Sequence, residues 1–338
     1  METLRSYSET LPVRRVSLTS IFYALIETSC FVLLIFTVVG LFGPLHWGAD
    51  LANHARPFYL IGGVALVAVS LFFGHTVGFY TSLAIIAING FLVVPYLLPK
   101  IKAPPAAENS ITLMSANTLY GNYAPQELIN TIDTVDPDIL ILQEMGASNQ
   151  QKAAILWEKF PYVTDTPNRG TKEVLVFSKF PFDSVEYIAF DTPWRAQAHV
   201  TFTVNGQSFK VIGVHPKAPM SAGRFERRNI ELQKLAAEAA SVQTPIIVAG
   251  DMNITPWTPI FHRFLNESNL SDSRKRNGLN FTWAPHDVPL LIPIDQILYR
   301  NVDMHSFTSG PYTGSDHRPV IATFSLPTAD SNGSLASK

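Results

Sequence analysis

The hydrophobic positions of this chain form two patterns, long unbroken apolar runs near the start and short apolar runs afterwards. The long runs cover residues 18 to 42, 58 to 74 and 77 to 98. Crossing the hydrocarbon of a bilayer takes about 20 residues, so the first and third runs are long enough and the second is near the lower limit. We therefore predict three transmembrane helices within a membrane region that covers residues 1 to 99.

The position of charged residues predicts the orientation of this region. A cleaved signal peptide would have one short apolar core, and three runs do not fit that pattern. The basic residues near the runs divide evenly between the two sides, but Arg14 and Arg15 abut the first run, which usually dominates orientation. We expect a cytoplasmic N-terminus. Because three is an odd number of spans, the rest of the chain would lie on the extracytoplasmic side of the inner (plasma) membrane.

The first apolar run contains a carboxylate, Glu27, and the only cysteine of the chain, Cys30. Glu27 could be a functional intramembrane carboxylate, but its place near one end, beside Thr28 and Ser29, favours an interfacial or hydrogen-bonded side chain. Cys30 is the lone cysteine, so no intramolecular disulfide can form.

Short apolar runs alternate with longer amphipathic segments between residues 111 and 326. This mixture predicts an α/β domain with packed sheets and outer helices. The predicted strands cover 111 to 116, 138 to 143, 174 to 178, 199 to 204, 209 to 214, 245 to 250, 294 to 299 and 320 to 325. The predicted helices cover 125 to 135, 149 to 159, 222 to 240 and about 257 to 266. A proline- and alanine-rich linker (100 to 110) precedes the domain, and a tail of disordered composition (327 to 338) follows it.

Polar side chains that could bind a metal or a phosphate recur at the ends of the predicted strands. An ordinary turn after a strand would explain any one of them, because Asp and Asn are common turn residues. Their recurrence is more informative, since α/β sheets build their sites at strand ends. The residues are Asn117, Glu144, His215, Asp251, Asn253, Asp316 and His317.

The segments around these residues resemble a known family. SANTLYGN, DPDILILQEM, VIGVHPKAP, VAGDMNITP, PIDQILY and GSDHRPV are similar, in this order, to motifs of the endonuclease/exonuclease/phosphatase superfamily, the deoxyribonuclease-I-like fold. The resemblance covers about residues 110 to 326. It implies a four-layer α/β sandwich with its site at one edge of the sheets, and hydrolysis of a phosphoester with a divalent metal, usually Mg²⁺, with Mn²⁺ as an alternative. The membrane region has no counterpart in the family's core domain.

The resemblance also implies a metal ligand set. Glu144 would be the primary ligand, with Asn117 and Asp316 near it. Carboxylate oxygens suit this role because Mg²⁺ prefers hard oxygen ligands and keeps positions for water and a substrate phosphate.

The remaining residues would act on water and on the phosphate. His317 is the best candidate for the general base, because imidazole titrates near neutral pH, and Asp295 would orient it. His215 would contact the scissile phosphate or assist the leaving group. Asn253, like Asn117, would bind a phosphoryl oxygen. Asp251 would position or deprotonate water, so the duty of the base stays divided between Asp251 and His317.

Charge bears on the substrate. Residues 106 to 338 contain 19 Lys+Arg and 23 Asp+Glu, whereas a protein that grips a nucleic-acid duplex usually shows a basic face. Two basic clusters, at residues 224 to 228 and 274 to 276, are interpreted as solvated faces. The short linker would hold the domain near the bilayer.

Three hypotheses follow. The first is a membrane-anchored, metal-dependent phosphoesterase that hydrolyses a phospholipid head group or a small phosphodiester. The second is a membrane-tethered nuclease with the same catalytic residues, acting on DNA or RNA. The third, a non-catalytic membrane binding protein, is disfavoured because the set of polar residues is intact. No protein partner is evident from the sequence.

Overall fold

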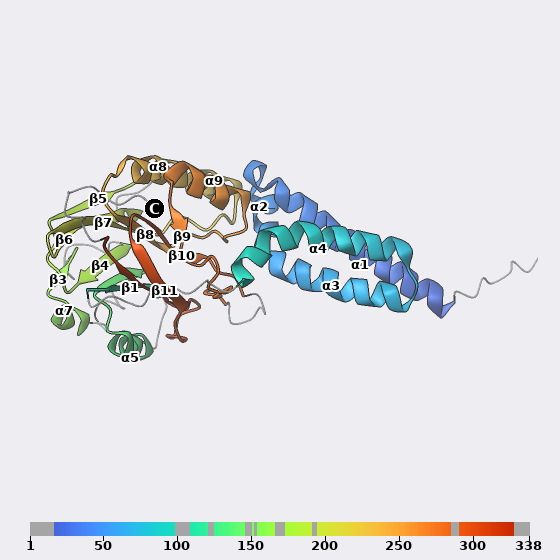
Figure 1. The fold of residues 1–338 in the computed structure, drawn as a ribbon, viewed down its shortest axis with the longest axis horizontal. Coiled ribbons are helices and arrows are strands. Elements are labelled where there is room, and N and C mark those ends of the chain that lie inside the picture. The colour runs from blue at the N-terminus through green and yellow to red at the C-terminus, as the bar shows by residue number, and fades with distance from the viewer. Residues whose placement is uncertain are drawn as a thin grey trace, which may run out of the picture.

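The chain folds into an elongated helical bundle joined end-on to an α/β domain (Figure 1). The computed structural model describes residues 17–98, 109–120, 125–145, 151, 154–165, 173–190, 195–284 and 291–327. The bundle contains α1 (Leu18–Leu41), the 3-10 helix η1 (Gly43–Leu45), α2 (Trp47–Asn53), α3 (Arg56–Phe72) and α4 (Thr76–Leu97).

All three predicted apolar runs are helical. By length and composition α1 and α4 could each cross a membrane; α1, with 24 residues, is about 36 Å long. The second run forms α3, whose axis is bent by 60° from that of α2. It gives a third candidate span only if α2 and α3 together form one bent span. α1 and α4 run toward the α/β domain and α3 runs away from it, so the start of α1 and the α/β domain lie at opposite ends of the bundle (Figure 1).

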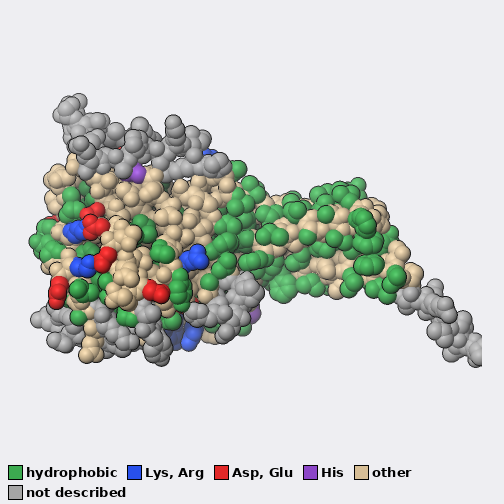
Figure 2. Space-filling view, turned by 90° about the horizontal axis from the view of Figure 1, so that it is seen from below, with side chains coloured by type: hydrophobic (Ala, Val, Ile, Leu, Met, Phe, Trp, Pro, Cys, Tyr) green, Lys and Arg blue, Asp and Glu red, His purple; other side chains and the backbone are tan. Residues whose placement is uncertain are grey.

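The surface of the bundle is apolar along its length, whereas the charged side chains visible in Figure 2 lie on the α/β domain. Large apolar side chains point outward from every long helix; Phe31, Phe72 and Phe91 are 62%, 83% and 82% exposed. An apolar surface of this extent is unfavourable in water and marks contact with lipid or with another protein.

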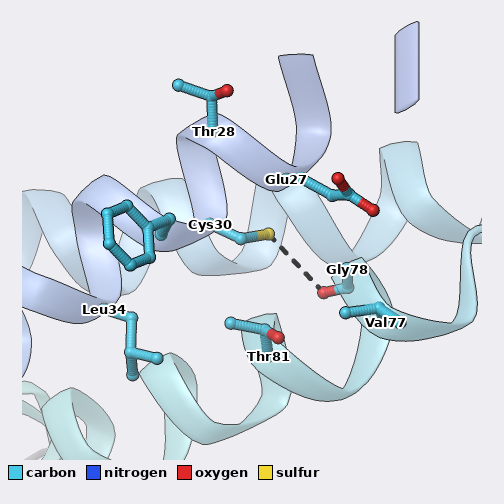
Figure 3. A pocket seen from close by; sticks show the side chains of 8 residues that line it. Glu27, Thr28, Cys30, Leu34, Val77, Gly78 and Thr81 are labelled. Carbon is cyan, nitrogen blue, oxygen red and sulfur yellow. Dashed lines mark hydrogen bonds between the residues drawn. The ribbon is translucent and has the colours of Figure 1, made fainter. Parts of the chain in front are cut away.

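Glu27 lies at the end of the bundle remote from the α/β domain, because its carboxylate contacts the α3–α4 turn. Its Oε1 is 3.3 Å from Nε2 of His75, and the Glu27 side chain is 59% exposed. It borders a cavity of about 420 Å³ between α1 and α4, beside the contact between Cys30 Sγ and the Gly78 carbonyl (Figure 3). This placement agrees with a hydrogen-bonded side chain near one end of the bundle.

The α/β domain is built on two mixed sheets. Both join mostly antiparallel strands around one parallel pair, β1 with β2 and β7 with β8. The first sheet has the order β11 (Asp303–Ser309), β12 (Val320–Ser325), β1 (Ile111–Asn117), β2 (Ile139–Gln143), β4 (Val174–Ser178) and β3 (Tyr162–Val163). The second has the order β5 (Ser184–Ile188), β6 (Gln197–Val204), β7 (Gln207–Val214), β8 (Ile246–Asp251), β10 (Asp295–Arg300) and β9 (Ser271–Asp272).

The sheets pack face to face, and helices cover their outer faces. Buried side chains of both sheets, among them Val176, Val200 and Phe209, form the central core. Helices α5 (Pro125–Val135) and α7 (Leu156–Lys159) pack on the first sheet, and α8 (Ala222–Ser241) and α9 (Pro259–Ser268) pack on the second. The predicted α/β sandwich of two sheets flanked by helices is therefore confirmed.

The differences from the predicted elements have local causes. All eight predicted strands are present, whereas β3, β5, β9 and β11 were not predicted. Two of these are only two residues long, β5 is largely exposed, and β11 has an irregular register between Met304 and Ser306 that breaks the alternation of apolar residues. Of the predicted helix 149–159, the structure describes the final turn as α7, and residues 146–150 and 152–153 lie outside the described residues.

The bundle docks on the α/β domain through buried polar contacts. Asp50 of the bundle pairs with Arg228 of α8 at 2.8 Å, and both side chains are fully buried. Arg228, predicted to lie on a solvated face, is thus part of the interface. Three further contacts join the bundle to residues 255–257: His54 Nδ1 to Thr255 Oγ1 (3.2 Å), Trp257 Nε1 to the Asn53 carbonyl (2.6 Å), and Tyr96 Oη to the Pro256 carbonyl (3.1 Å).

Replacing Asp50 by alanine should destabilise the full chain by about 3–5 kcal/mol, because Arg228 would stay buried without a counter-charge. Chemical denaturation in detergent micelles, followed by tryptophan fluorescence, measures the change. The matched control is Asp50→Leu combined with Arg228→Met, which removes both charges and should recover most of the stability. Equal denaturation midpoints for Asp50→Ala and the unaltered chain would show that the ion pair does not stabilise the docked state.

Candidate active site

The register of the strands brings most of the sequence-predicted residues to one edge of the sandwich. Asn117 at the end of β1 pairs with the last residue of β2, so Glu144 follows beside it. In the second sheet Asp251 at the end of β8 pairs with Asp295 at the start of β10. His215 follows β7 directly.

Gly250 allows the close approach of β7 and β8 that places Asp251 beside His215. Its φ of 151° lies in a region that side chains rarely adopt, and a Cβ atom at this position would stand 2.0 Å from the Val214 carbonyl oxygen. Glycine is therefore the residue that this contact requires.

Two site residues adopt left-handed backbone conformations. Glu144 has φ 56° and Asn253 has φ 50°. For Asn253 the reason is local, since its backbone N–H donates to Oδ1 of Asp251 at 2.9 Å and closes an Asx turn. The strand geometry therefore ends at Asp251, and the turn sets the direction of the Asn253 side chain. Nδ2 of Asn253 donates to the Pro216 carbonyl (3.0 Å) and to Asp251 Oδ2 (3.3 Å).

Asp251 is the centre of the cluster and is 2% exposed. Its Oδ2 accepts a hydrogen bond from Asn117 Nδ2 at 3.1 Å. The same oxygen lies 3.4 Å from Nε2 of His215 and 3.7 Å from Nε2 of His317. The two imidazoles, one just after β7 and the other just before β12, thus face the same carboxylate.

Each of these histidines has a second carboxylate on its other ring nitrogen. Nδ1 of His317 is 2.9 Å from Asp295 Oδ2, and Nδ1 of His215 is 2.7 Å from Glu173 Oε1. Burial by itself lowers a histidine pKa, but the surrounding carboxylates outweigh it and raise the pKa of His317 to about 9 and that of His215 to about 10. Burial raises the pKa of Asp251, yet the two histidines outweigh it, so its pKa is lowered and it stays ionised.

In a chelator-containing buffer, the stabilising contribution of His317 should be lost as the pH rises. Its folded pKa of about 9 exceeds the ordinary value of about 6.5, so the contribution is complete below about pH 6.5 and disappears as the pH rises through 9. The thermal midpoint of His317→Gln should therefore lie well below that of the unaltered chain at pH 6.5 and approach it by pH 10. A difference that stays constant over this range would contradict the raised pKa.

The predicted metal ligands Glu144 and Asp316 border the same cavity. Glu144 is held by Asn117 Nδ2 on Oε1 (3.1 Å) and by the backbone N–H of Tyr120 on Oε2 (3.2 Å), and Asp316 Oδ2 accepts from Trp283 Nε1 (2.9 Å). Two oriented carboxylates at a cavity fit a hard divalent cation such as Mg²⁺. Asn117 turns its amide nitrogen toward Glu144 and its oxygen toward the backbone of Leu119, so in this arrangement it positions the ligand.

Among the described residues, one group has ligand atoms close enough to hold an ion together, namely Asp251, Asp295 and His317, whose atoms lie within 4.8 Å of one another. Nδ1 of His317 and Oδ2 of Asp295 are already hydrogen-bonded to each other, so these two atoms are not free to bind an ion. The trio is therefore better suited to orient an imidazole than to bind a metal, and Glu144 with Asp316 remains the stronger metal candidate.

Glu173 and Arg195 belong to the site but were not predicted. Glu173 is 2% exposed and contacts both His215 and, at 3.2 Å, Arg195 Nη2. Its sequence signal is weak, because Glu173 precedes strand β4 instead of following a strand. Arg274, predicted on a solvated face, is also buried, and its guanidinium donates to the Asp295 carbonyl. It fixes the backbone that carries the partner of His317.

The site opens into a cavity of about 820 Å³. Its lining includes the candidate catalytic residues Glu144, His215, Asp251 and His317, and Arg195, Lys217 and Arg224 add positive charge. One wall comes from the bundle, through Leu51 and His54. The cavity thus lies at the junction of the two parts of the chain.

Comparison with known proteins agrees with this geometry. The model of the Endonuclease/Exonuclease/phosphatase family matches residues 114–317. The chain belongs to this family. Members of the family are generally metal-dependent hydrolases of phosphoesters, which confirms the class implied by the motifs. A search of curated proteins gave no match.

Solved structures share the fold of the α/β domain. Humanized D. rerio TDP2 is 16% identical, with 65% of this chain and all of that chain covered and a TM-score of 0.53. The catalytic domain of human Nocturnin, with bound sulfate, is 20% identical, with 65% and 96% covered and a TM-score of 0.52. At these identities the similarity concerns the fold alone. The covered share is about that of the α/β domain, so the helical bundle is additional to the shared fold.

Proposed function

We propose that this protein is a membrane-anchored, divalent-metal-dependent phosphoesterase that hydrolyses a phosphodiester or a phosphomonoester. The observation that carries the proposal is the convergence of Glu144, Asp251, His215 and His317 on one cavity. Such a set supplies what the reaction needs, namely an activated water, neutralised phosphoryl charge and help for the leaving oxygen.

Glu144 and Asp316 would hold the metal, with Asn117 fixing Glu144. A bound Mg²⁺, or Mn²⁺, would neutralise charge on the phosphoryl oxygens. The cationic side chains of the cavity lining would orient the phosphate, whereas both N–H groups of the Asn253 amide are used by the Pro216 carbonyl and Asp251, so Asn253 holds Asp251 instead of the predicted phosphoryl oxygen. Two buried carboxylates, Asp251 and Glu173, flank His215, which favours its protonated form and thus a role in protonating or binding an oxygen of the substrate.

His317 is the candidate general base, a role it fills only in its neutral form; because its pKa is about 9, the active fraction should grow as the pH rises toward 9. Asp295 holds its Nδ1, which directs Nε2 toward the reacting centre. That Nε2 is 3.7 Å from Asp251 Oδ2, beyond hydrogen-bond distance, so a water on the cavity side of the two atoms could contact both groups. Asp251, held by Asn117 and Asn253, would orient this water.

The place of the cavity favours a phospholipid head group or a small phosphodiester over a nucleic acid. It lies where an apolar bundle meets the α/β domain, and the chain outside the bundle carries more acidic than basic residues. The bundle would anchor the protein in the inner (plasma) membrane, with its exposed apolar side chains in lipid.

A substrate assay tests the proposal. The full chain in detergent micelles should hydrolyse bis(4-nitrophenyl) phosphate or phospholipid with Mg²⁺, and lose the activity when a chelator removes the metal. Plasmid DNA and RNA serve as parallel substrates. Cleavage of DNA that falls steeply with added salt would favour the nuclease instead. Absence of hydrolysis of all four substrates, at every metal tested, would reject the enzyme.

The proposed orientation predicts the location of the C-terminus. A reporter enzyme that is active only outside the cytoplasm, fused after Lys338, should be active, because three antiparallel helices put the two ends of the bundle on opposite sides. The same reporter fused before the first helix should be inactive and serves as the control. The reverse result would place the α/β domain in the cytoplasm.

A further inference from the structure

We propose that the bundle is part of the active site: Leu51 and His54 of the segment 47–56 complete the cavity and select a phosphoester attached to a membrane lipid. This inference rests on the proposed function and adds to it the residues that determine the substrate class. It makes Leu51 a specificity-determining residue rather than a residue of an anchor.

The first observation is the composition of the cavity wall. Leu51 and His54 line the same cavity as Asp251, Asn253 and His317, although about 200 residues separate them in sequence. His54 is 7% exposed and hydrogen-bonded to Thr255 of the α/β domain. Leu51 is half-buried and has an apolar side chain. Leu51 therefore offers an apolar surface to whatever occupies the cavity.

The second observation is the fixed position of this wall. Asp50, Asn53 and His54 each contact the α/β domain, through an ion pair, a hydrogen bond from Trp257 and a contact with Thr255. Arg228, the partner of Asp50, also donates to the Asn253 carbonyl at 3.2 Å. These contacts join α2 directly to the turn after Asp251, so the wall and the catalytic turn are held to each other.

The third observation is the mixed polarity of the cavity lining. The cationic Arg195, Lys217 and Arg224 attract an anionic group. The apolar lining comes from residues of both parts of the chain: Leu51, Leu119, Pro219, Met220, Ile292 and Ile294. Met220 is 60% exposed, so the apolar lining continues to the outer surface. A ligand that carries both a phosphate and an apolar part fits such a mixed lining.

The fourth observation is the continuity with the bundle. α2 follows η1 at the end of α1, where Leu45 is 77% exposed. A phospholipid beside the bundle would therefore have its head group near the cavity mouth while its acyl chains stay in the hydrocarbon. A small water-soluble phosphodiester depends less on the apolar wall, because it does not have to reach the cavity from the bilayer.

The test compares two substrates on the full chain with Mg²⁺, reconstituted in vesicles of phosphatidylethanolamine and phosphatidylglycerol. Leu51→Glu should lower the release of phosphate-containing head groups or phosphate from the vesicle lipids by about tenfold or more. Hydrolysis of bis(4-nitrophenyl) phosphate by the same preparation should stay within about twofold of the unaltered chain, and this activity shows that the variant is folded. Val185→Glu, which puts the same carboxylate on an exposed apolar side chain of β5 outside the cavity, should leave both activities unchanged.

The outcomes separate the two proposals. If Leu51→Glu and the milder Leu51→Ser both lower the two activities equally, Leu51 is structural and the inference is wrong. If Leu51→Ser lowers the lipid activity alone, the equal loss in Leu51→Glu reflects misfolding and the inference stands. If the unaltered chain cleaves the aryl phosphodiester but no vesicle lipid, the inference fails and the proposed function stands. If it cleaves neither, both fail.

Discussion

Replacing His317 by alanine should lower phosphoester hydrolysis by about 10²–10⁴-fold, because a positioned acid or base contributes about this much. The structure gives the reason for a large effect: Asp295 fixes Nδ1, and Nε2 faces the carboxylate at the centre of the cluster. The measurement is kcat/KM on bis(4-nitrophenyl) phosphate at saturating Mg²⁺, with the full chain in detergent.

Two further variants make the result specific. Asp295→Asn keeps the shape of the site but removes the carboxylate that favours the productive orientation of His317, so it should also lose activity. His305→Ala is the matched control, because His305 lies on β11 and contacts Ser325, outside the cavity. Full activity of a folded His317→Ala variant would exclude this histidine as the base.

Replacing Asp251 by alanine should abolish hydrolysis, a loss of about 10³-fold or more, while the α/β domain stays folded. Removing this carboxylate leaves Asn117, Asn253, His215 and His317 without the group on which they converge. The loss should appear in kcat on both the aryl phosphodiester and the lipid, in contrast to Leu51→Glu.

The control for Asp251 is Asp183→Ala, which removes an exposed carboxylate bonded to Thr203 and should leave activity unchanged. Circular dichroism and thermal denaturation would show whether Asp251→Ala is folded. A folded variant with full activity would reduce Asp251 to a residue that shapes the turn after β8.

Asp50 is also linked to the catalytic turn, besides its contribution to stability. Asp50 pairs with Arg228, and Arg228 donates to the Asn253 carbonyl, so the bundle is linked to the catalytic turn by two contacts. The α/β domain therefore should not be assayed without the bundle, because its separation would expose Arg228 and one side of the cavity.

The sequence by itself determined the elements and the chemistry. Apolar runs fixed the helices of the bundle and the eight central strands, since periodicity and length are local properties. Motifs at strand ends identified Glu144, Asp251 and His317 as site candidates. The registers of the paired strands place these residues at one edge of the sandwich. The family followed from the same motifs.

Only the tertiary structure decided which charged residues are buried and how the two parts of the chain meet. Arg228 and Arg274 lie in basic clusters that are typical of solvated faces, yet each is buried because a distant partner, Asp50 or the Asp295 backbone, satisfies it. The pairing of Glu173 with His215 and the place of Leu51 in the cavity wall likewise depend on contacts between remote segments. Local pattern carries no information about such contacts, since their stability arises only when the folded chain removes both partners from water.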